Sequence, residues 1–274
     1  MAEGVNVFIS ADMEGTAGVT GWEETQPGHL LYPRAQELMV GEVNAAIEGA
    51  LAAGAGAILV NDSHDGMRNL PPSAVHPAAD LLLGWPKRYS MAEGGRGHDV
   101  ALFTGYHAAA GAPGNLAHTM TLHLVEVRLN GRRASETLFH AGLLGVWGVP
   151  VGMVTGDEVL GEHVAELMPW AVFVPVKRPV SLTAAVNLSP ERARARIREG
   201  AREAVARARA GGLRPLVLPA PYTVEVVFTE QDRAARALTC PRSERVDNST
   251  VAYRADDFEE AYLAMRTLTR LGTA

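Results

Sequence analysis

A buried strand followed by an acidic turn is encoded by the N-terminal stretch Val5-Asn6-Val7-Phe8-Ile9-Ser10-Ala11-Asp12-Met13-Glu14-Gly15. Residues 5–10 are mostly apolar and rich in β-branched and aromatic side chains, which is typical of a short strand buried in a sheet. The polar cluster that follows places Asp12 and Glu14 just beyond the carboxyl end of this strand. The stretch therefore predicts a strand with two carboxylates at its exit.

The pattern of a buried strand ending in polar residues occurs twice more. Residues 33–54 have the apolar spacing of a helix, with Pro33 near the start, and a second strand at residues 57–60 leads into Asn61-Asp62-Ser63-His64. A third strand at residues 100–104 leads into Gly105-Tyr106-His107. Strands that alternate with helices in this order predict a parallel sheet with right-handed crossovers.

Residues that could bind a metal follow all three predicted strands. Because the loops beyond the carboxyl ends of parallel strands converge on one crevice, Asp12, Glu14, His64 and His107 are expected to lie together there. Carboxylate oxygens and imidazole nitrogens suit zinc, and also manganese or cobalt. A carboxylate that bridges two ions would give the kind of centre that two-metal hydrolases use to activate water.

The rest of the chain continues the α/β pattern and then changes. Residues 118–129 are predicted to form one long strand ending at the turn Asn130-Gly131, followed by helices at 135–147 and 158–167 and strands at 149–154 and 172–177. The last third has a charged helix starting at Ser189-Pro190, strands at 222–228 and 249–254, and a helix at 256–271. We expect an α/β fold, with a mainly parallel sheet flanked by helices in a metal-binding catalytic domain (residues 1–180) and a smaller α+β subdomain (residues 181–274).

Composition limits the class of protein. The 274 residues are 47% hydrophobic and 20% charged, which is ordinary for a globular chain, and the net charge of −6 argues against a nucleic acid as partner. The single cysteine, Cys240, cannot form a disulfide within the chain. No apolar stretch reaches the roughly 18 residues of a membrane span. No basic segment followed by a long apolar core begins the sequence, so we expect a cytoplasmic protein without contact to a membrane.

Four separated motifs resemble the signature segments of a known family. They are Ser10-Ala11-Asp12-Met13-Glu14-Gly15, Asn61-Asp62-Ser63-His64, Gly105-Tyr106-His107 and His118-Thr119-Met120. In this order they are similar to segments of the bacterial zinc D-aminopeptidases, which often carry the name dipeptide transport protein. The resemblance continues through residues 153–158 into the C-terminal helix, so it covers most of the chain.

The resemblance implies a function and a set of site residues. It implies an aminopeptidase that binds two zinc ions and cleaves short peptides, with an N-terminal D-amino acid such as D-alanine. Asp12 would bridge both ions, and Glu14, His64, His107 and Glu136 would complete the two sets of ligands. His118 would be catalytic. The resemblance also implies a homo-oligomer, a decamer of two stacked pentamers around an inner channel.

His118 also has features that the residues themselves suggest. It begins the predicted strand at 118–129, so Met120, Leu122 and Leu124 would share its face of the sheet. An imidazole at the head of an apolar face, beside a Gly-rich loop, suits a general base, a general acid or an oxyanion stabiliser. A buried histidine bonded to the backbone is the other interpretation.

One segment departs from the family pattern. Where related sequences tend to have Glu-x-Gly-x-Asn, this chain has Glu136-Thr137-Leu138-Phe139-His140. The expected ligand Glu136 is kept, but its bulkier neighbours put the preference for D-residues in doubt.

Two other functions fit parts of the pattern. The same ligands could serve a metal-dependent amidase or esterase acting on another small molecule, because bound metals activate water whatever the leaving group. A peptide-binding component of a transporter is the alternative outside the enzymes. Such a component needs no cluster of metal ligands, which favours the enzyme.

Overall fold

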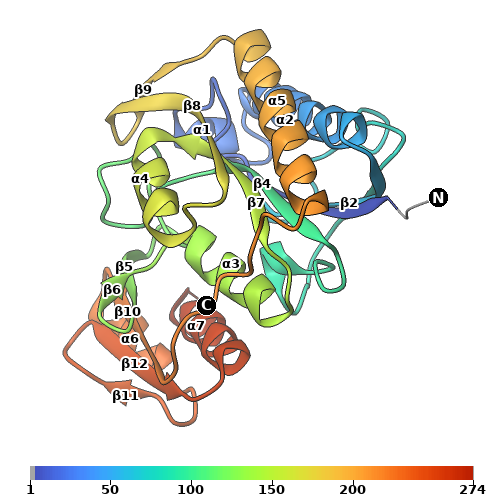
Figure 1. Cartoon of the computed structure of the whole chain (residues 1–274). Coiled ribbons are helices and arrows are strands. Elements are labelled where there is room, and N and C mark those ends of the chain that lie inside the picture. The colour runs from blue at the N-terminus through green and yellow to red at the C-terminus, as the bar shows by residue number, and fades with distance from the viewer. Residues whose placement is uncertain (1–3, 274) are drawn as a thin grey trace.

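The computed structural model describes residues 4–273, which form two sheets surrounded by helices (Figure 1). In order across the larger sheet, the strands are β3 (Asp80–Leu82), β2 (Ala55–Asp62), β1 (Val5–Ala11), β4 (Val100–Tyr106), β7 (Val151–Asp157), β8 (Val172–Ser181) and β9 (Ala184–Asn187). Neighbouring strands are parallel except β8 and β9, which form an antiparallel hairpin at one edge. The predicted α/β fold with a mainly parallel sheet is confirmed.

The strand order reverses beside β1. The chain runs from β1 to β2 and β3 on one side, and then returns to place β4 on the other side of β1. In open parallel sheets such a reversal opens a crevice at the carboxyl ends of the strands, and ligands bind there. The sheet order therefore puts a binding crevice beyond the ends of β1, β2 and β4.

Helices cover both faces of the larger sheet. One face packs against α2 (Tyr32–Ala52) and α5 (Pro190–Arg209), and the other packs against α3 (Glu136–Val146) and α4 (Glu158–Leu167) (Figure 1). The side chains of β1 alternate between the two cores, since Val7 and Ile9 join the core of α2 and α5 whereas Phe8 joins that of α3. Burial on both faces explains why the strand segments are so apolar.

A second, antiparallel sheet packs beyond α3. Its strands in order are β11 (Glu244–Arg245), β12 (Thr250–Ala255), β10 (Tyr222–Phe228), β5 (Leu124–Leu129) and β6 (Arg132–Arg133). The helices α6 (Gln231–Ala237) and α7 (Phe258–Thr273) pack on it, and α7 also contacts α3. Two short helical segments, α1 (Trp22–Thr25) and η1 (Ser90–Ala92), complete the elements.

Contacts cross the expected domain boundary near residue 180. The second sheet takes β5 and β6 from the first part of the chain, and α5 from the last part packs against α2. The division into residues 1–180 and 181–274 stays a prediction, and the two parts share their cores.

The prediction of one strand over residues 118–129 is wrong in its first half. Only Leu124–Leu129 forms β5, and the preceding segment is irregular, with Met120 at φ +63°. The backbone N–H of Met120 donates to Glu136 Oε1 at 2.6 Å instead of pairing with a strand. Consequently His118 lies in a loop over the end of the larger sheet.

Within residues 4–273, no helix is both long and apolar enough to cross a bilayer.

Candidate metal centre

The expected ligands lie where the parallel strands end. Asp12 follows β1 directly and Glu14 comes two residues later, His64 follows β2, and His107 follows β4. All four side chains are buried, with at most 5% of each residue exposed. The prediction that these strand ends bring the four residues together is confirmed.

Two glycines allow the loops after β1 and β4 to touch. The N–H of Gly15 donates to the carbonyl of Gly105 at 2.7 Å, and that of Asp12 donates to the carbonyl of Thr104 at 2.9 Å. A Cβ on Gly105, which has φ +68°, would lie 2.1 Å from the Asp12 carbonyl oxygen, and one on Gly15 would lie 1.7 Å from that of Tyr106. Only glycine fits at both positions, and the contact holds the Asp12 loop close to His107.

The first group of ligand atoms comes from Asp12, Glu14 and His64, and these atoms lie within 4.8 Å of one another. His64 Nδ1 is 2.9 Å from Glu14 Oε2 and 3.4 Å from Asp12 Oδ1. On the other side of the ring, Nε2 lies 2.8 Å from the carbonyl of Thr25. A proton on Nε2 satisfies that carbonyl and leaves the Nδ1 lone pair facing the carboxylates, as metal-binding histidines require.

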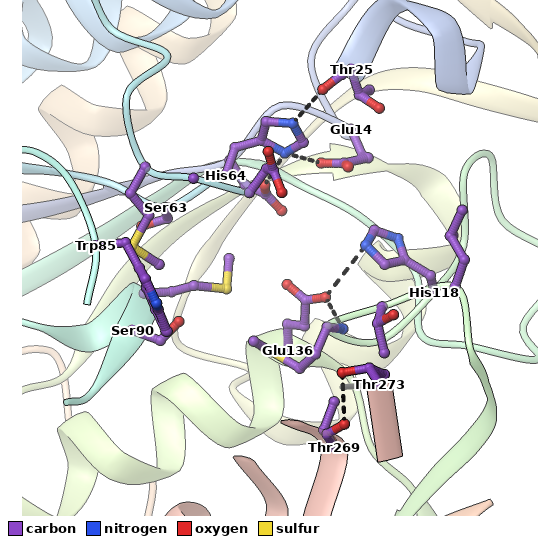
Figure 2. Close-up of a pocket in the computed structure, with 18 of the residues that line it drawn as sticks. Glu14, Thr25, Ser63, His64, Trp85, Ser90, His118, Glu136, Thr269 and Thr273 are labelled. Atoms are coloured by element: carbon purple, nitrogen blue, oxygen red, sulfur yellow. Dashed lines mark hydrogen bonds and ion pairs between the residues drawn. The ribbon is translucent and has the colours of Figure 1, made fainter. Parts of the chain in front are cut away.

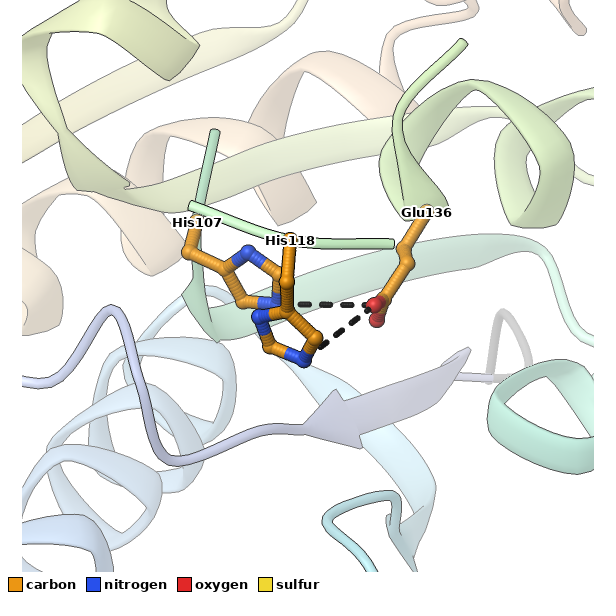
Figure 3. A group of neighbouring side chains, drawn as sticks. All are labelled: His107, His118 and Glu136. Atoms are coloured by element: carbon orange, nitrogen blue, oxygen red, sulfur yellow. Dashed lines mark ion pairs between the residues drawn. The ribbon is translucent and has the colours of Figure 1, made fainter. Parts of the chain in front are cut away.

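The second group comes from His107, His118 and Glu136, again within 4.8 Å (Figure 3). His107 Nε2 is 3.5 Å from Glu136 Oε1, and its Nδ1 faces the carbonyl of Ala108 at 2.9 Å. The ring of His118 stacks on that of His107 with centroids 4.1 Å apart. His118 Nδ1 faces the Leu116 carbonyl at 2.9 Å, and its Nε2 is 3.8 Å from Glu136 Oε1.

Asp12 joins the two groups. Its Oδ1 faces His64 at 3.4 Å and its Oδ2 faces His107 Nε2, also at 3.4 Å. A carboxylate whose two oxygens point into two different ligand sets has the geometry of a bridge between two ions.

The donor atoms fit a pair of cations. Asp12 Oδ2, Glu14 Oε2 and His107 Nε2 are buried and make no hydrogen bond within the described residues. Buried polar atoms without partners are costly, so three of them in one place indicate a group that satisfies them. Three carboxylates and three imidazoles match the oxygen and nitrogen donors that zinc, manganese and cobalt accept.

Protons compete with cations for this site. Burial and the neighbouring Glu14 charge raise the pKa of Asp12. Burial alone would raise the pKa of Glu136, but the nearby charge of His107 lowers it to about 2. Burial opposes the charged form of His107 as well, yet the Glu136 and Asp12 carboxylates hold its pKa well above the usual range. Positive charge is therefore strongly favoured between these carboxylates, whether carried by protons or by metals.

A model of the D-aminopeptidase family matches residues 5–267, nearly the whole chain. The chain belongs to the D-aminopeptidase family. It is 35% identical to the D-aminopeptidase of Bacillus subtilis (strain 168) over 272 residues, which cover 97% of each chain. Its structure is similar to that of the Zn-dependent D-aminopeptidase from Bacillus subtilis, a self-compartmentalizing protease, with a TM-score of 0.92, 33% identity and 98% of both chains covered. The resemblance inferred from the four motifs is thereby confirmed.

In this D-aminopeptidase-family chain, the site opens into one large pocket of about 850 Å³ (Figure 2). Asp12, Glu14, His64, His118 and Glu136 line it, together with residues of α1, of the loops after β2 and β3, and of α7. Such a volume suits a small molecule or a short peptide.

The unusual neighbours of Glu136 do not line this pocket. Thr137, Phe139 and His140 are fully buried inside α3, and Leu138 is 5% exposed. His140 Nδ1 bonds back to the Glu136 carbonyl at 2.7 Å, and burial lowers the pKa of this imidazole to about 4. His140 is therefore a neutral residue of the helix, and none of the four side chains that follow Glu136 lines the pocket.

Asp62 and Asp157 have structural roles. The Asp62 carboxylate accepts from the N–H of Asn69 at 2.5 Å and from that of Leu70 at 2.8 Å, so it organises the loop after β2 and does not contact the His64 ring. Asp157 caps α4 by accepting from Val159 and Leu160. Both carboxylates therefore bind backbone N–H groups of the segments that follow them.

A buried lysine that the sequence analysis missed ties the site loops together. Lys177 Nζ donates to the carbonyls of Glu14 and Val19 and to Asn115 Oδ1. Asn115 in turn donates to the carbonyls of Thr20 and Leu182, at 3.2 and 2.9 Å. Lys177 thus connects the loop of Glu14 with the loop that leads to His118. Lys177 ends a predicted strand that is otherwise apolar, and nothing in that local pattern indicates a buried lysine that binds distant loops.

A second buried group, Glu42 of α2, supports the same loop and titrates near neutral pH. Its Oε1 accepts from the N–H of Ala17 at 2.8 Å, and Oε2 has no hydrogen-bond partner within residues 4–273. Burial raises the pKa of Glu42 from 4.5 to about 7, against the charges of Lys177 and Arg194. Because the folded state binds this proton more tightly than the unfolded chain, stability is lost as the pH rises from 4.5 through about 7.

We expect Glu42→Gln to remove this pH dependence. Between about pH 5.5 and about pH 8, the free energy of unfolding of the wild type should fall by about 2 kcal/mol relative to that of the variant. Only the wild type has a buried carboxyl whose ionisation opposes folding. Urea unfolding of both proteins across this range measures the difference, in which the titration of the shared site residues cancels. If the free energies of unfolding of the two proteins change equally with pH, ionisation of Glu42 does not destabilise the folded state.

Proposed function

We propose that this chain is a two-metal aminopeptidase in which Asp12, Glu14 and His64 hold one ion and Asp12, His107 and Glu136 hold the other. The observation that carries the proposal is the position of the Asp12 carboxylate, whose two oxygens face two separate imidazoles at 3.4 Å each. The carbonyls of Thr25 and Ala108 fix the two rings with their ligand nitrogens turned inward. Each imidazole is therefore held with one nitrogen facing the carboxylates.

Zinc is the metal we propose, because the related Bacillus subtilis enzyme is Zn-dependent and the donor set suits this ion. Manganese and cobalt accept the same donors. Bound at these ligands, two ions would lower the pKa of a water molecule to near neutrality and polarise the carbonyl of the scissile peptide bond.

His118 is the group we propose to move the proton. Its Nδ1–H donates to the Leu116 carbonyl, and the ring is held between His107, on which it stacks, and the edge of Trp22, 5.5 Å away between centroids. Nε2 is thereby directed toward Glu136 and the pocket (Figure 2). An imidazole fixed in this way can take a proton at Nε2 and deliver it to the leaving amine.

We propose short peptides with an N-terminal D-residue as substrates. Family membership supports an aminopeptidase, and none of the side chains from Thr137 to His140 lines the pocket. Trp22, Thr25 and Met120 are among the residues that line the pocket, and such mostly apolar side chains can distinguish the two configurations of a small side chain.

Hydrolysis of D-alanyl-D-alanine tests this function. We expect it to be cleaved with a kcat/KM about 10- to 200-fold above that of L-alanyl-L-alanine, because the two isomers differ in a few apolar contacts. Chelation should abolish cleavage, and added zinc should restore it. Equal rates on the two isomers would remove the stereochemical preference, and faster cleavage of simple amides or esters than of either dipeptide would favour the amidase.

We also propose that the chain forms a closed homo-oligomer, a decamer of two pentamers. Its relative is described as a self-compartmentalizing protease, and the β8–β9 hairpin exposes the apolar side chains Val180, Leu182 and Val186 by half or more. A cluster of this kind on an edge hairpin is typical of a protein interface. A monomer mass in light scattering at micromolar concentration would contradict this proposal.

A further inference from the structure

The wall of the pocket away from the metal ligands is basic. It contains Arg266 and Arg270, one turn apart on α7, and Arg68 from the loop after β2. Figure 2 shows Trp85 across the pocket from His118, with Thr269 and Thr273 of α7 along the floor. The pocket thus has an acidic end that binds cations and a second end that carries arginines.

A tryptophan holds the two arginines of α7. The guanidinium carbon of Arg270 is 4.1 Å from the centroid of the Trp85 ring, and that of Arg266 is 5.0 Å from it. Arg266 is buried, with 9% of its surface exposed, and its Nη1 donates to the carbonyls of Lys87 and Arg88 at 3.3 and 3.1 Å. Stacking fixes the planes of these cations, and their N–H groups other than those on Arg266 Nη1 remain able to donate hydrogen bonds.

These positive charges have no acidic partner in the described part of the chain. No carboxylate of residues 4–273 lies within 4.0 Å of a side-chain nitrogen of Arg68, Arg266 or Arg270, whereas nine other arginines are paired in this way. Burial and the neighbouring Arg266 lower the pKa of Arg270, so the two cations repel each other. In a chain with a net charge of −6, like charges gathered beside a cavity are stabilised when an anion binds between them.

We infer that Arg266 and Arg270, stacked on Trp85, form a carboxylate subsite for the end of the peptide that lies away from the metal centre. This inference rests on the proposed aminopeptidase function. A peptide bound with its scissile bond at Asp12 and Glu136 extends into the same cavity, where a guanidinium pairs with a carboxylate through parallel hydrogen bonds. The subsite selects short peptides with a free carboxylate, and it disfavours amides and long chains that place no negative charge there.

Three dipeptide substrates with one scissile bond test the subsite. They are D-alanyl-D-alanine, its C-terminal amide, and D-alanyl-D-glutamic acid α-amide, whose carboxylate is on the side chain. We expect the wild type to prefer the free acid over the amide by about 10- to 100-fold in kcat/KM, mainly through KM, because one charge-assisted pair is lost in the amide. Recovery of the rate with the glutamyl amide would show that a side-chain carboxylate also reaches the arginines.

The variant Arg270→Gln should reduce the preference for the acid over the amide to about threefold or less. The matched control is Arg96→Gln, because Arg96 stacks on Trp147 at 4.7 Å and does not line the pocket. It should keep the wild-type ratio. An Arg270→Gln protein that loses activity equally on both substrates, or that keeps the full preference, overturns the subsite. A wild type that cleaves none of the three would instead overturn the proposed function, and the subsite with it.

Discussion

Replacement of Asp12 with asparagine is expected to lower kcat/KM by a factor of about a thousand or more and to reduce bound zinc below two equivalents per chain. Asp12 is the one side chain whose oxygens face both ligand groups, at 3.4 Å on each side. An amide keeps the shape but loses the charge and one acceptor, so it cannot bridge two cations. Loss of several kcal/mol of charge stabilisation corresponds to this factor.

Metal analysis and steady-state kinetics of the same Asp12→Asn preparation measure both effects. Asp65→Asn is the matched control, because this exposed carboxylate lines the pocket next to His64 but belongs to neither ligand group. It should keep two equivalents of zinc and most of the activity. An Asp12 variant that retains two equivalents and full turnover would show that Asp12 does not bridge.

His118→Ala is expected to lower turnover by about a hundred- to ten-thousandfold while both metals remain bound. The side chain of His118 is 13% exposed, more than those of Asp12, Glu14, His64, His107 and Glu136. Its Nε2 lies 3.8 Å from Glu136, beyond hydrogen-bond distance, so it is directed at the pocket rather than engaged with a neighbour. Removing a proton-transfer group should lower kcat more than it changes binding.

The control for this variant is His123→Ala, which removes an exposed imidazole from the same segment. Its activity and metal content should match the wild type. His118 lies within 4.8 Å of the ligand atoms of His107 and Glu136, so the geometry also permits it to bind an ion. If His118→Ala loses one equivalent of metal, His118 is a ligand and the proton transfer belongs to another group.

The positions of four of the proposed ligands could be predicted from the residues alone, because the βαβ order brings the carboxyl ends of the parallel strands together. Glu136 could not. It begins a helix, and its carboxylate reaches the site only because α3 starts beside the loop of His118, where it accepts from Met120. Only the resemblance to a family pointed to it.

The prediction of a strand over residues 118–123 was wrong for a related reason. Alternation of Met120, Leu122 and Leu124 predicts a strand, but the positive φ of Leu116 and Met120 and the bond from Met120 to Glu136 break the ladder. The bond between Met120 and Glu136 joins residues that are separated along the sequence, and no local pattern contains it. The same is true of Lys177, whose bonds to Glu14 and Asn115 depend on the position of β8 beside β7.

The most direct test of the account is an anomalous-scattering map of the crystalline protein at the zinc edge. We predict two peaks about 3.5–4 Å apart, one among Asp12, Glu14 and His64 and the other among Asp12, His107 and Glu136. A map with no peak beside Asp12, in protein that still cleaves D-alanyl dipeptides, would contradict it.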